Sequence, residues 1–377
     1  MHYETGKAIT VQTKDTKISR ITFTEGLIKN CFIAPGLVDL QVNGYKGIDF
    51  NREDLTVSEV SLITRLLLKE GVTSFYPTIV TGSLDKTLKL CSVIAQAVEV
   101  NQLVQKSIKG IHLEGPFISA EDGPRGAHAK QHICPPDWLF IEKVQQAARG
   151  LVKIITLAPE WQESPLFIKK AVEQNLVVAI GHTAASSAQI KAAIKAGASF
   201  STHLGNGAHP VMKRHPNYIW DQLAEDSLAA TVIADGFHLP MNVLRVISAV
   251  KKEKMLLVSD SVALAGEPPG EYETAVGGRV CLTKEGRLHL ATNEELLAGS
   301  SFHLRQCVEK LVEEGITSLS SALNLASIHP ARMVGLDQQK GLLEGAMADF
   351  ILYQVDHSGR LIILKTIKEG EVVYTSY

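Results

Sequence analysis

The chain has 377 residues and a formal net charge of −2, and 45% of its residues are hydrophobic. This length suits one large domain with a smaller one, and the nearly balanced charge leaves no global field to attract nucleic acid or an anionic membrane. No run of about 18 apolar residues could span a bilayer, and the five scattered cysteines form no C-x-x-C pair that would indicate a thiolate zinc site.

Both ends of the chain alternate apolar and polar residues, which is typical of antiparallel strands. The pattern covers residues 8–34 and 349–377. We expect residues 1–34 and 347–377 to form one small β-sandwich domain. The N-terminus lacks the basic-then-apolar pattern of a signal peptide, so a reducing cytoplasm is the expected location.

Eight short apolar runs lie between the two ends and alternate with segments of helical period. They begin at Phe32, Val72, Ile108, Leu151, Leu176, Ala198, Ala229 and Met255. Continuous apolar runs fit parallel strands that are buried on both faces, and eight β/α units are the number that closes a TIM-type (β/α)₈ barrel. We therefore expect an α/β barrel over residues 35–346, with a hairpin insertion at residues 266–292, where Gly277-Gly278 supplies a turn.

Polar residues cluster where five of these runs end. Four runs deliver a histidine or an aspartate and a fifth delivers a glutamate, namely Glu114, His182, His203, Asp235 with His238, and Asp260. A single histidine at a strand end is more often a structural residue. Because active sites in such barrels lie at the C-terminal ends of the strands, five polar strand ends on one rim predict a functional site.

Three of these residues form a ligand set. Glu114, His182 and His203 offer two imidazole nitrogens and one carboxylate, a common set for Zn²⁺, and Fe²⁺ or Mn²⁺ would accept the same donors. Such a metal activates water and polarises a carbonyl. Asp260 is placed to take a proton from that water and to pass it to a leaving amine. The pattern therefore predicts a hydrolase that depends on one divalent metal ion.

The strand ends belong to longer motifs that follow one another along most of the chain. They are PGLVD from Pro35, HLEGPF from His112, GHT from Gly181, THLGN from Thr202, ADGFH ending at His238, VSDS from Val258, LAGSS from Leu297, NLASIHPARMVGL from Asn324 and GLLEGAMADFILY from Gly341. Each motif alone is weak, but the ordered set resembles the amidohydrolase superfamily and, more closely, the N-acetylglucosamine-6-phosphate deacetylase family. The resemblance implies hydrolysis of the N-acetyl amide of an amino sugar, with N-acetylglucosamine 6-phosphate as the favoured substrate and glucosamine 6-phosphate and acetate as products.

The resemblance also implies roles for individual residues. The metal ligands would be the three residues named above, and Asp260 would be the general base and acid. His128 would help to polarise the acetyl carbonyl. Substrate contacts would come from Asn206, Gly207 and His238. Arg214 would reach the 6-phosphate of a neighbouring subunit's substrate, which implies a homodimer.

Two departures from the related sequences bear on these expectations. Many amidohydrolases carry His-x-His on strand one and bind a second metal there, whereas this chain has Gln41 and Asn43. Neutral amides are poor zinc ligands, so a single-metal site is expected. The common deacetylase pattern continues Arg-Glu-Pro-Gly at the phosphate arginine, whereas this chain reads Arg214-His215-Pro216-Asn217. This change leaves open whether the sugar carries a phosphate.

Three other functions remain open at this point. The chain could deacetylate an unphosphorylated N-acetylhexosamine, or it could be another single-metal amidohydrolase, such as a dihydroorotase-like enzyme or an amino-acid deacylase. It could also be a barrel that has lost catalysis and serves as a scaffold. The complete ligand set and Asp260 argue against the scaffold, and metal analysis of the purified protein would separate the two classes.

Overall fold

The computed structural model describes residues 1–25, 30–274 and 278–376. Residues 26–29, within the predicted N-terminal strands, and Gly277 of the predicted hairpin lie outside the described residues.

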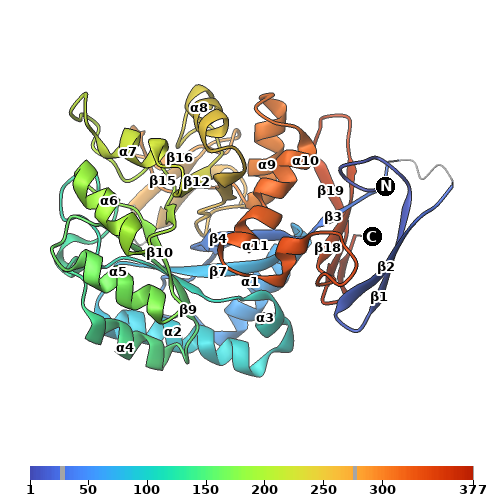
Figure 1. Cartoon of the computed structure of the whole chain (residues 1–377), viewed down its shortest axis with the longest axis horizontal. Coiled ribbons are helices and arrows are strands. Elements are labelled where there is room, and N and C mark those ends of the chain that lie inside the picture. Colours follow the sequence, from blue (N-terminus) through green and yellow to red (C-terminus); the bar gives the residue numbers. More distant parts are fainter. Residues whose placement is uncertain (26–29, 275–277, 377) are drawn as a thin grey trace.

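A barrel of eight parallel strands forms the centre of the molecule (Figure 1). In order around the barrel, the strands are β4 (Leu37–Val42), β7 (Val72–Val80), β8 (Ile111–Glu114), β9 (Val152–Leu157), β10 (Val177–Ile180), β11 (Phe200–Ser201), β12 (Ala229–Ile233) and β13 (Met255–Val258). A parallel bridge between Val42 and Ser261 joins the two ends of the sheet, and the backbone amide of Asp260 donates to the carbonyl of Gln41 at 3.0 Å. The barrel therefore closes beside the residue that the sequence predicts to be the base.

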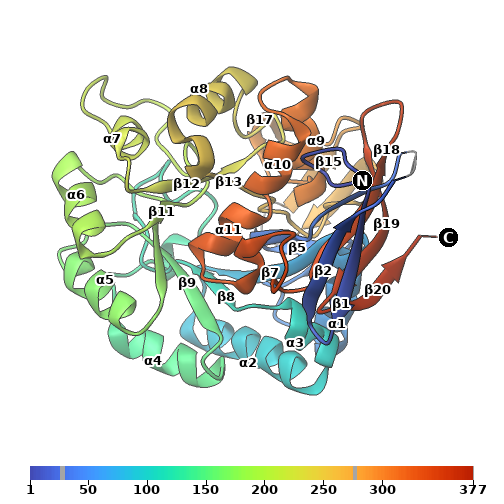
Figure 2. The same cartoon turned by 45° about the vertical axis from the view of Figure 1, so that its right-hand side comes forward.

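Helices cover the outside of the barrel (Figures 1 and 2). They are α1 (Val57–Lys69), α2 (Leu84–Val100), α3 (Gln102–Ser107), α4 (Trp138–Ala147), α5 (Ser164–Glu173), α6 (Ser187–Ala196), α7 (Tyr218–Ala224), α8 (Met241–Lys251), α9 (Leu304–Glu313), α10 (Leu319–Leu325) and α11 (Ile328–Met333), with 3₁₀ turns at Lys130–His132, Lys252–Lys254 and Asp337–Lys340.

Local sequence explains why these segments form strands and helices. Strand β7 is almost entirely buried, as expected for a strand covered on both faces. Helix α1 begins with a capping box between Thr56 and Glu59, which satisfies two backbone amides that a helix start leaves free. Val60, Ile63 and Leu67 follow at helical spacing and are buried against the barrel.

Both ends of the chain pack together at one side of the barrel (Figure 2). Strands β1 (Ile9–Lys14) and β2 (Lys17–Phe23) pair with each other, and β3 (Phe32–Pro35) joins β18 (Phe350–Val355), β19 (Leu361–Lys368) and β20 (Glu371–Thr375) in a second antiparallel sheet. Ile18, Phe350 and Ile367 belong to one buried cluster between the two sheets. The structure thus confirms both parts of the predicted fold class, the barrel and the small β-sandwich.

A third antiparallel sheet follows the last barrel strand. Its strands are β14 (Gly270–Thr274), β15 (Gly278–Leu282), β16 (Leu288–Leu290) and β17 (Asn293–Leu297), in the region where the sequence predicts a hairpin insertion. A short pair, β5 (Gly44–Tyr45) and β6 (Ile48–Asp49), follows the first barrel strand. Val280, Leu282 and Leu288 give the inserted sheet its own small apolar cluster.

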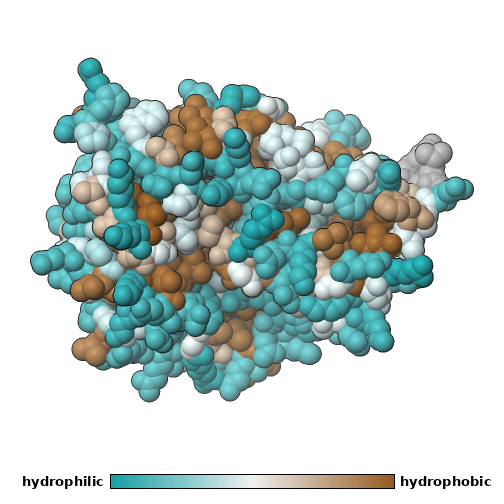
Figure 3. Space-filling model, in the orientation of Figure 1, coloured by the Kyte–Doolittle hydropathy of each residue, from teal (hydrophilic) through white to brown (hydrophobic). Residues whose placement is uncertain are grey.

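Polar residues cover most of the face that Figure 3 presents, and apolar residues appear there in separate patches. Among the described residues, no helix has both the length and the apolar character needed to cross a membrane.

Candidate active site

The predicted metal ligands lie together at the C-terminal rim of the barrel. Glu114 ends β8, His182 follows β10 by two residues, and His203 follows β11 by two residues. All three side chains are buried. Oε1 of Glu114 lies 3.1 Å from Nε2 of His182 and 2.8 Å from Nε2 of His203. The structure therefore brings the predicted triad to one point.

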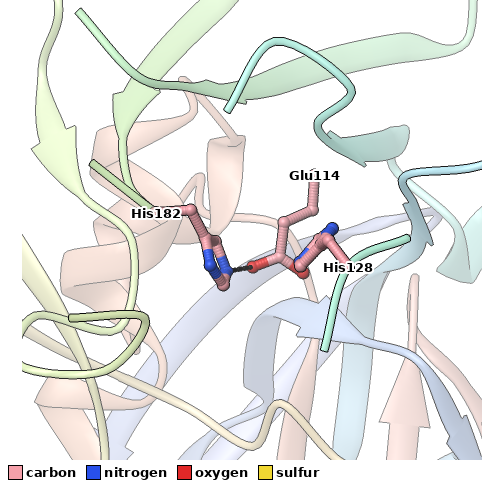
Figure 4. A group of neighbouring side chains, drawn as sticks. All are labelled: Glu114, His128 and His182. Carbon is pink, nitrogen blue, oxygen red and sulfur yellow. Dashed lines mark hydrogen bonds and ion pairs between the residues drawn. The ribbon is translucent and has the colours of Figure 1, made fainter. Parts of the chain in front are cut away.

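His128 joins this group from the loop after β8. Glu114, His128 and His182 each offer a donor atom, and these atoms lie within 4.8 Å of one another. Figure 4 shows the three side chains converging, with an interaction drawn between His182 and Glu114. The rings of His182 and His203 are also close, with centroids 4.8 Å apart. The cluster thus holds three imidazoles around one carboxylate.

The hydrogen bonds of the cluster fit a divalent cation. Nδ1 of His182 lies 2.8 Å from the carbonyl oxygen of Pro124, an atom that can only accept, so Nδ1 carries the proton. Nε2 of His182 and the carboxylate of Glu114 would then be free to hold a divalent cation, and a carbonyl that fixes the tautomer in this way is usual behind a metal-bound histidine.

The charges of the cluster agree with this interpretation. Burial would raise the pKa of Glu114, but the adjacent imidazoles of His182 and His203 outweigh the burial and hold that pKa well below its ordinary value. Burial and the neighbouring His182 lower the pKa of His128 to about 3, so its imidazole is neutral at physiological pH. Two nitrogens, a carboxylate and a neutral third imidazole suit a divalent transition-metal ion.

Asp260 lies at the mouth of the site, two residues after β13. Although part of it reaches the surface, the surrounding protein desolvates its carboxyl and raises its pKa to about 6, and repulsion from Glu114 adds to the rise. Nδ2 of Asn43 donates to Oδ1 of Asp260 at 2.7 Å, and Nε2 of Gln41 donates to Oε1 of Glu114 at 2.9 Å. The side-chain amides of Asn43 and Gln41, at the end of the first barrel strand β4, therefore hydrogen-bond to the carboxylates of Asp260 and Glu114, respectively. As neutral amides they are poor zinc ligands, and the sequence alone does not predict these contacts.

Three residues of the site have an unusual backbone conformation. The φ angles of His182, His203 and Asp260 are +50°, +30° and +47°. Side-chain-bearing residues rarely adopt positive φ, and each such residue costs about 1–3 kcal/mol unless its surroundings impose it. Strain of this kind gathers at functional sites, and here it falls on two predicted ligands and the predicted base.

His238 is held by the carboxylate of Asp235, for which the sequence predicts no separate role. Nδ1 of His238 lies 2.6 Å from Oδ2 of Asp235, and the backbone amides of Phe237 and His238 donate to Oδ1. Burial would raise the pKa of Asp235, but these hydrogen bonds lower it. The Asp-x-x-His spacing of the ADGFH motif could have indicated this pair.

The remaining predicted substrate residues lie on the long loop after β11. Asn206 is half-buried and donates to the carbonyl of His203 at 3.2 Å. Gly207 has a φ of +55°, and a Cβ added there would lie 2.5 Å from Nδ1 of His182, so the loop needs glycine at this point. Arg214 is exposed. Figure 1 shows the segment that leads into α7 projecting outward from the barrel.

Comparisons with known proteins show the family to which this chain belongs. The model of the Amidohydrolase family matches residues 32–373. N-acetylglucosamine-6-phosphate deacetylase of Bos taurus is 34% identical over 354 residues, which are 91% of this chain and 84% of the relative. The enzyme of that name from Bacillus subtilis (strain 168) is 33% identical, with 91% and 85% covered.

Solved structures show the same relationship. The N-acetyl-D-glucosamine-6-phosphate deacetylase of Mycobacterium smegmatis has a TM-score of 0.84 and 28% identity, with 97% of this chain and 95% of that chain covered, and a mutant of that protein was solved in complex with N-acetyl-D-glucosamine-6-phosphate. The enzyme from Thermotoga maritima has a TM-score of 0.83 and 29% identity, with 97% and 95% covered. The chain therefore belongs to the amidohydrolase family and, within it, to the N-acetylglucosamine-6-phosphate deacetylases.

Proposed function

We propose that this protein hydrolyses the N-acetyl amide of N-acetylglucosamine 6-phosphate to give glucosamine 6-phosphate and acetate. The observation that carries the proposal is the convergence of Glu114, His182 and His203 beside Asp260 at the rim of the barrel. The names of the relatives and the sugar phosphate bound to the Mycobacterium smegmatis mutant support it.

Glu114, His182 and His203 would hold one divalent metal ion, with Zn²⁺ as the first candidate and Fe²⁺ or Mn²⁺ as alternatives. When bound, such a metal supplies Lewis acidity for the amide carbonyl and for water. His128 lies close enough to be a fourth donor, but it comes from a loop rather than a strand end, and we assign it to the substrate instead.

Two residues would handle the reacting atoms. Asp260 would accept a proton from water as general base and then donate it to the leaving amine as general acid. Nδ1 of His128 lies 2.8 Å from Oγ1 of Thr81. If that nitrogen accepts from the hydroxyl, the neutral imidazole carries its proton on Nε2 and can donate to the acetyl carbonyl oxygen.

The sugar and its phosphate would be bound by His238, Asn206 and Gly207. Arg214 would reach the phosphate in a neighbouring subunit, because it is exposed on the segment before α7, which projects from the barrel (Figure 1). A guanidinium fork matches phosphate oxygens and stays charged at any working pH. The proposal therefore includes a homodimer, and it places the enzyme in the cytoplasm, where phosphorylated sugars are metabolised.

The test is a deacetylation assay over N-acetylhexosamines with and without a 6-phosphate, together with metal analysis of the purified protein. We expect N-acetylglucosamine 6-phosphate to be the best substrate and one tightly bound metal per chain. A preference for unphosphorylated sugars would replace the proposed substrate with the alternative that the altered Arg214 segment leaves open. A protein without metal or amidase activity would refute the proposal.

A further inference from the structure

Two loops of the active site meet at one side chain, His209. We define the β8 loop as residues 115–129, which carries His128, and the β11 loop as residues 202–217, which carries Asn206, Gly207 and Arg214. The β8 loop also holds His182 through the carbonyl of Pro124. The position of one loop relative to the other therefore sets where the substrate residues lie with respect to the metal centre.

The hydrogen bonds of His209 run in one direction from Tyr218 to Glu121. The backbone amide of His209 donates to the hydroxyl oxygen of Tyr218 at 2.8 Å, so the hydroxyl proton is free for Nδ1 of His209, 2.9 Å away. With Nδ1 as acceptor, the ring proton lies on Nε2, which faces Oε2 of Glu121 at 3.1 Å. This chain of contacts links α7 to both loops.

A second contact between the loops lies beside this one. Gly123 has a φ of +95°, and a Cβ at this position would lie 3.0 Å from Cα of His209 and 3.2 Å from the carbonyl oxygen of Ala208. The two backbones thus approach closely, and this approach brings Glu121 within reach of His209.

Packing does little to hold the β11 loop on its other side. A cavity of about 560 Å³ separates residues 209–217 from the start of α6, and both His209 and Tyr218 line it. Val211 is 87% exposed. By contrast, the ring of Tyr218 is buried, so the hydroxyl that receives the His209 amide is a fixed point. On the side of this pocket the loop is held by the hydrogen bonds of His209, whereas Ala208 and Met212 pack against the core elsewhere in the loop.

We propose that Glu121, His209 and Tyr218 form a latch that positions the β11 loop for substrate binding. This inference rests on the proposed function, because its consequence is substrate affinity. Glu121 and His209 are partly exposed, and such pairs contribute little to global stability. Loss of the latch should thus raise KM while kcat and the metal content stay near wild type, since none of the three residues contacts the metal cluster.

The kinetic test compares Glu121→Ala, Glu121→Gln and Tyr218→Phe, using the acetylated sugar that the wild type hydrolyses best in the assay above. Glu121→Ala removes the acceptor, and Tyr218→Phe removes the hydroxyl while keeping the buried ring. For each we expect KM to rise about 3- to 10-fold, the effect of one lost hydrogen bond. Glu121→Gln keeps an acceptor oxygen and should remain near wild type. Asp122→Ala is the matched control, because Asp122 lies in the same loop and pairs only with Arg125 among the described residues.

Hydrogen–deuterium exchange of the metal-loaded enzyme without substrate tests the latch independently of the reaction. Backbone amides of residues 206–217 should exchange faster in Glu121→Ala and Tyr218→Phe, and at the wild-type rate in Glu121→Gln and Asp122→Ala. Unchanged exchange would refute the latch. Faster exchange with an unchanged KM would refute its role in substrate binding. Failure of the proposed function appears separately, as a different best substrate of the wild type.

Discussion

Asn43 donates a hydrogen bond from Nδ2 to Oδ1 of Asp260 at 2.7 Å, so a side-chain amide at the end of β4 orients the proposed general base. Oδ1 of Asn43 is buried and has no partner among the described residues. The Nδ2 group of Asn43 thus donates to Asp260, whereas its Oδ1 atom accepts no hydrogen bond from the described residues. A histidine at this position would direct a lone pair at a metal, whereas asparagine directs a donor at the carboxylate.

We predict that Asn43→Ala lowers kcat by about 10- to 100-fold, since a hydrogen bond to a charged group contributes about 1.5–3 kcal/mol. KM and the metal content should change little, because Asn43 does not contact the predicted ligands. Gln41→Ala is the matched comparison two residues away. Its partner is Glu114, so that variant should lose metal affinity first. Equal metal loss in both variants would contradict the separation of roles.

Asp260→Asn should keep the fold and the metal while removing nearly all turnover, because an amide cannot accept a proton from water. General acid–base groups contribute about 10²- to 10⁴-fold, and this residue acts twice in the proposed reaction. Glu114→Gln should instead lose metal before it loses anything else. Steady-state rates with metal analysis of both variants check these outcomes, and a rate for Asp260→Asn above about a tenth of wild type would show that the base is wrongly assigned.

A pH effect on stability should come from Asp39, which lies inside the barrel below the site. Its side chain is 1% exposed, and burial raises its pKa to about 7, well above the ordinary value of an aspartate, although amide donors from Gln41 and Ser259 oppose the rise. The folded state therefore holds this proton more tightly than the unfolded state. Its stabilising contribution is complete below about pH 4 and is lost as the pH rises towards 7, with a slope of about 1.4 kcal/mol per pH unit.

Asp39→Asn removes this titration, so the stability of the variant relative to wild type should increase between pH 4.5 and 7.5. Melting temperatures across that range, with both proteins loaded with metal in the same way, measure the trend. Asp226→Asn, at an exposed position, is the control and should show no such trend. A constant difference between wild type and Asp39→Asn would mean that Asp39 does not hold its proton in the folded state.

The barrel and its polar rim could be predicted because both depend on local pattern. Buried parallel strands read as continuous apolar runs, and the barrel brings their C-terminal ends to one rim. The partners of Gln41 and Asn43 could not be predicted, because they depend on how the end of β4 lies relative to β8 and β13 in the closed barrel. The path of the β11 loop depends on the contact with Glu121, which lies 88 residues away in sequence. The division into residues 35–346 and the two terminal segments stays a prediction, as do the roles of the site residues.

The last prediction concerns Arg214 and the second subunit. If Arg214 binds the phosphate, wild type should prefer the phosphorylated sugar. Arg214→Ala should then lose about 10- to 100-fold in kcat/KM on that sugar alone, the equivalent of a charge-assisted hydrogen bond. An equal loss on both sugars would contradict a phosphate contact. Lys213 and His215 flank the arginine in sequence, so the local charge favours an anion.

Mixed dimers test whether the arginine acts across the interface. Arg214→Ala subunits keep Asp260, and Asp260→Asn subunits keep Arg214, so each variant alone is impaired for a different reason. If Arg214 serves the neighbouring site, a dimer with one subunit of each kind contains one site that has both residues, and mixing the variants should restore activity. If Arg214 serves its own site, no site in the mixed dimer is complete and the activity stays at the level of the separate variants. Co-refolding or co-expression with two different tags isolates the mixed dimer, and a dimer of two Arg214→Ala subunits is the control.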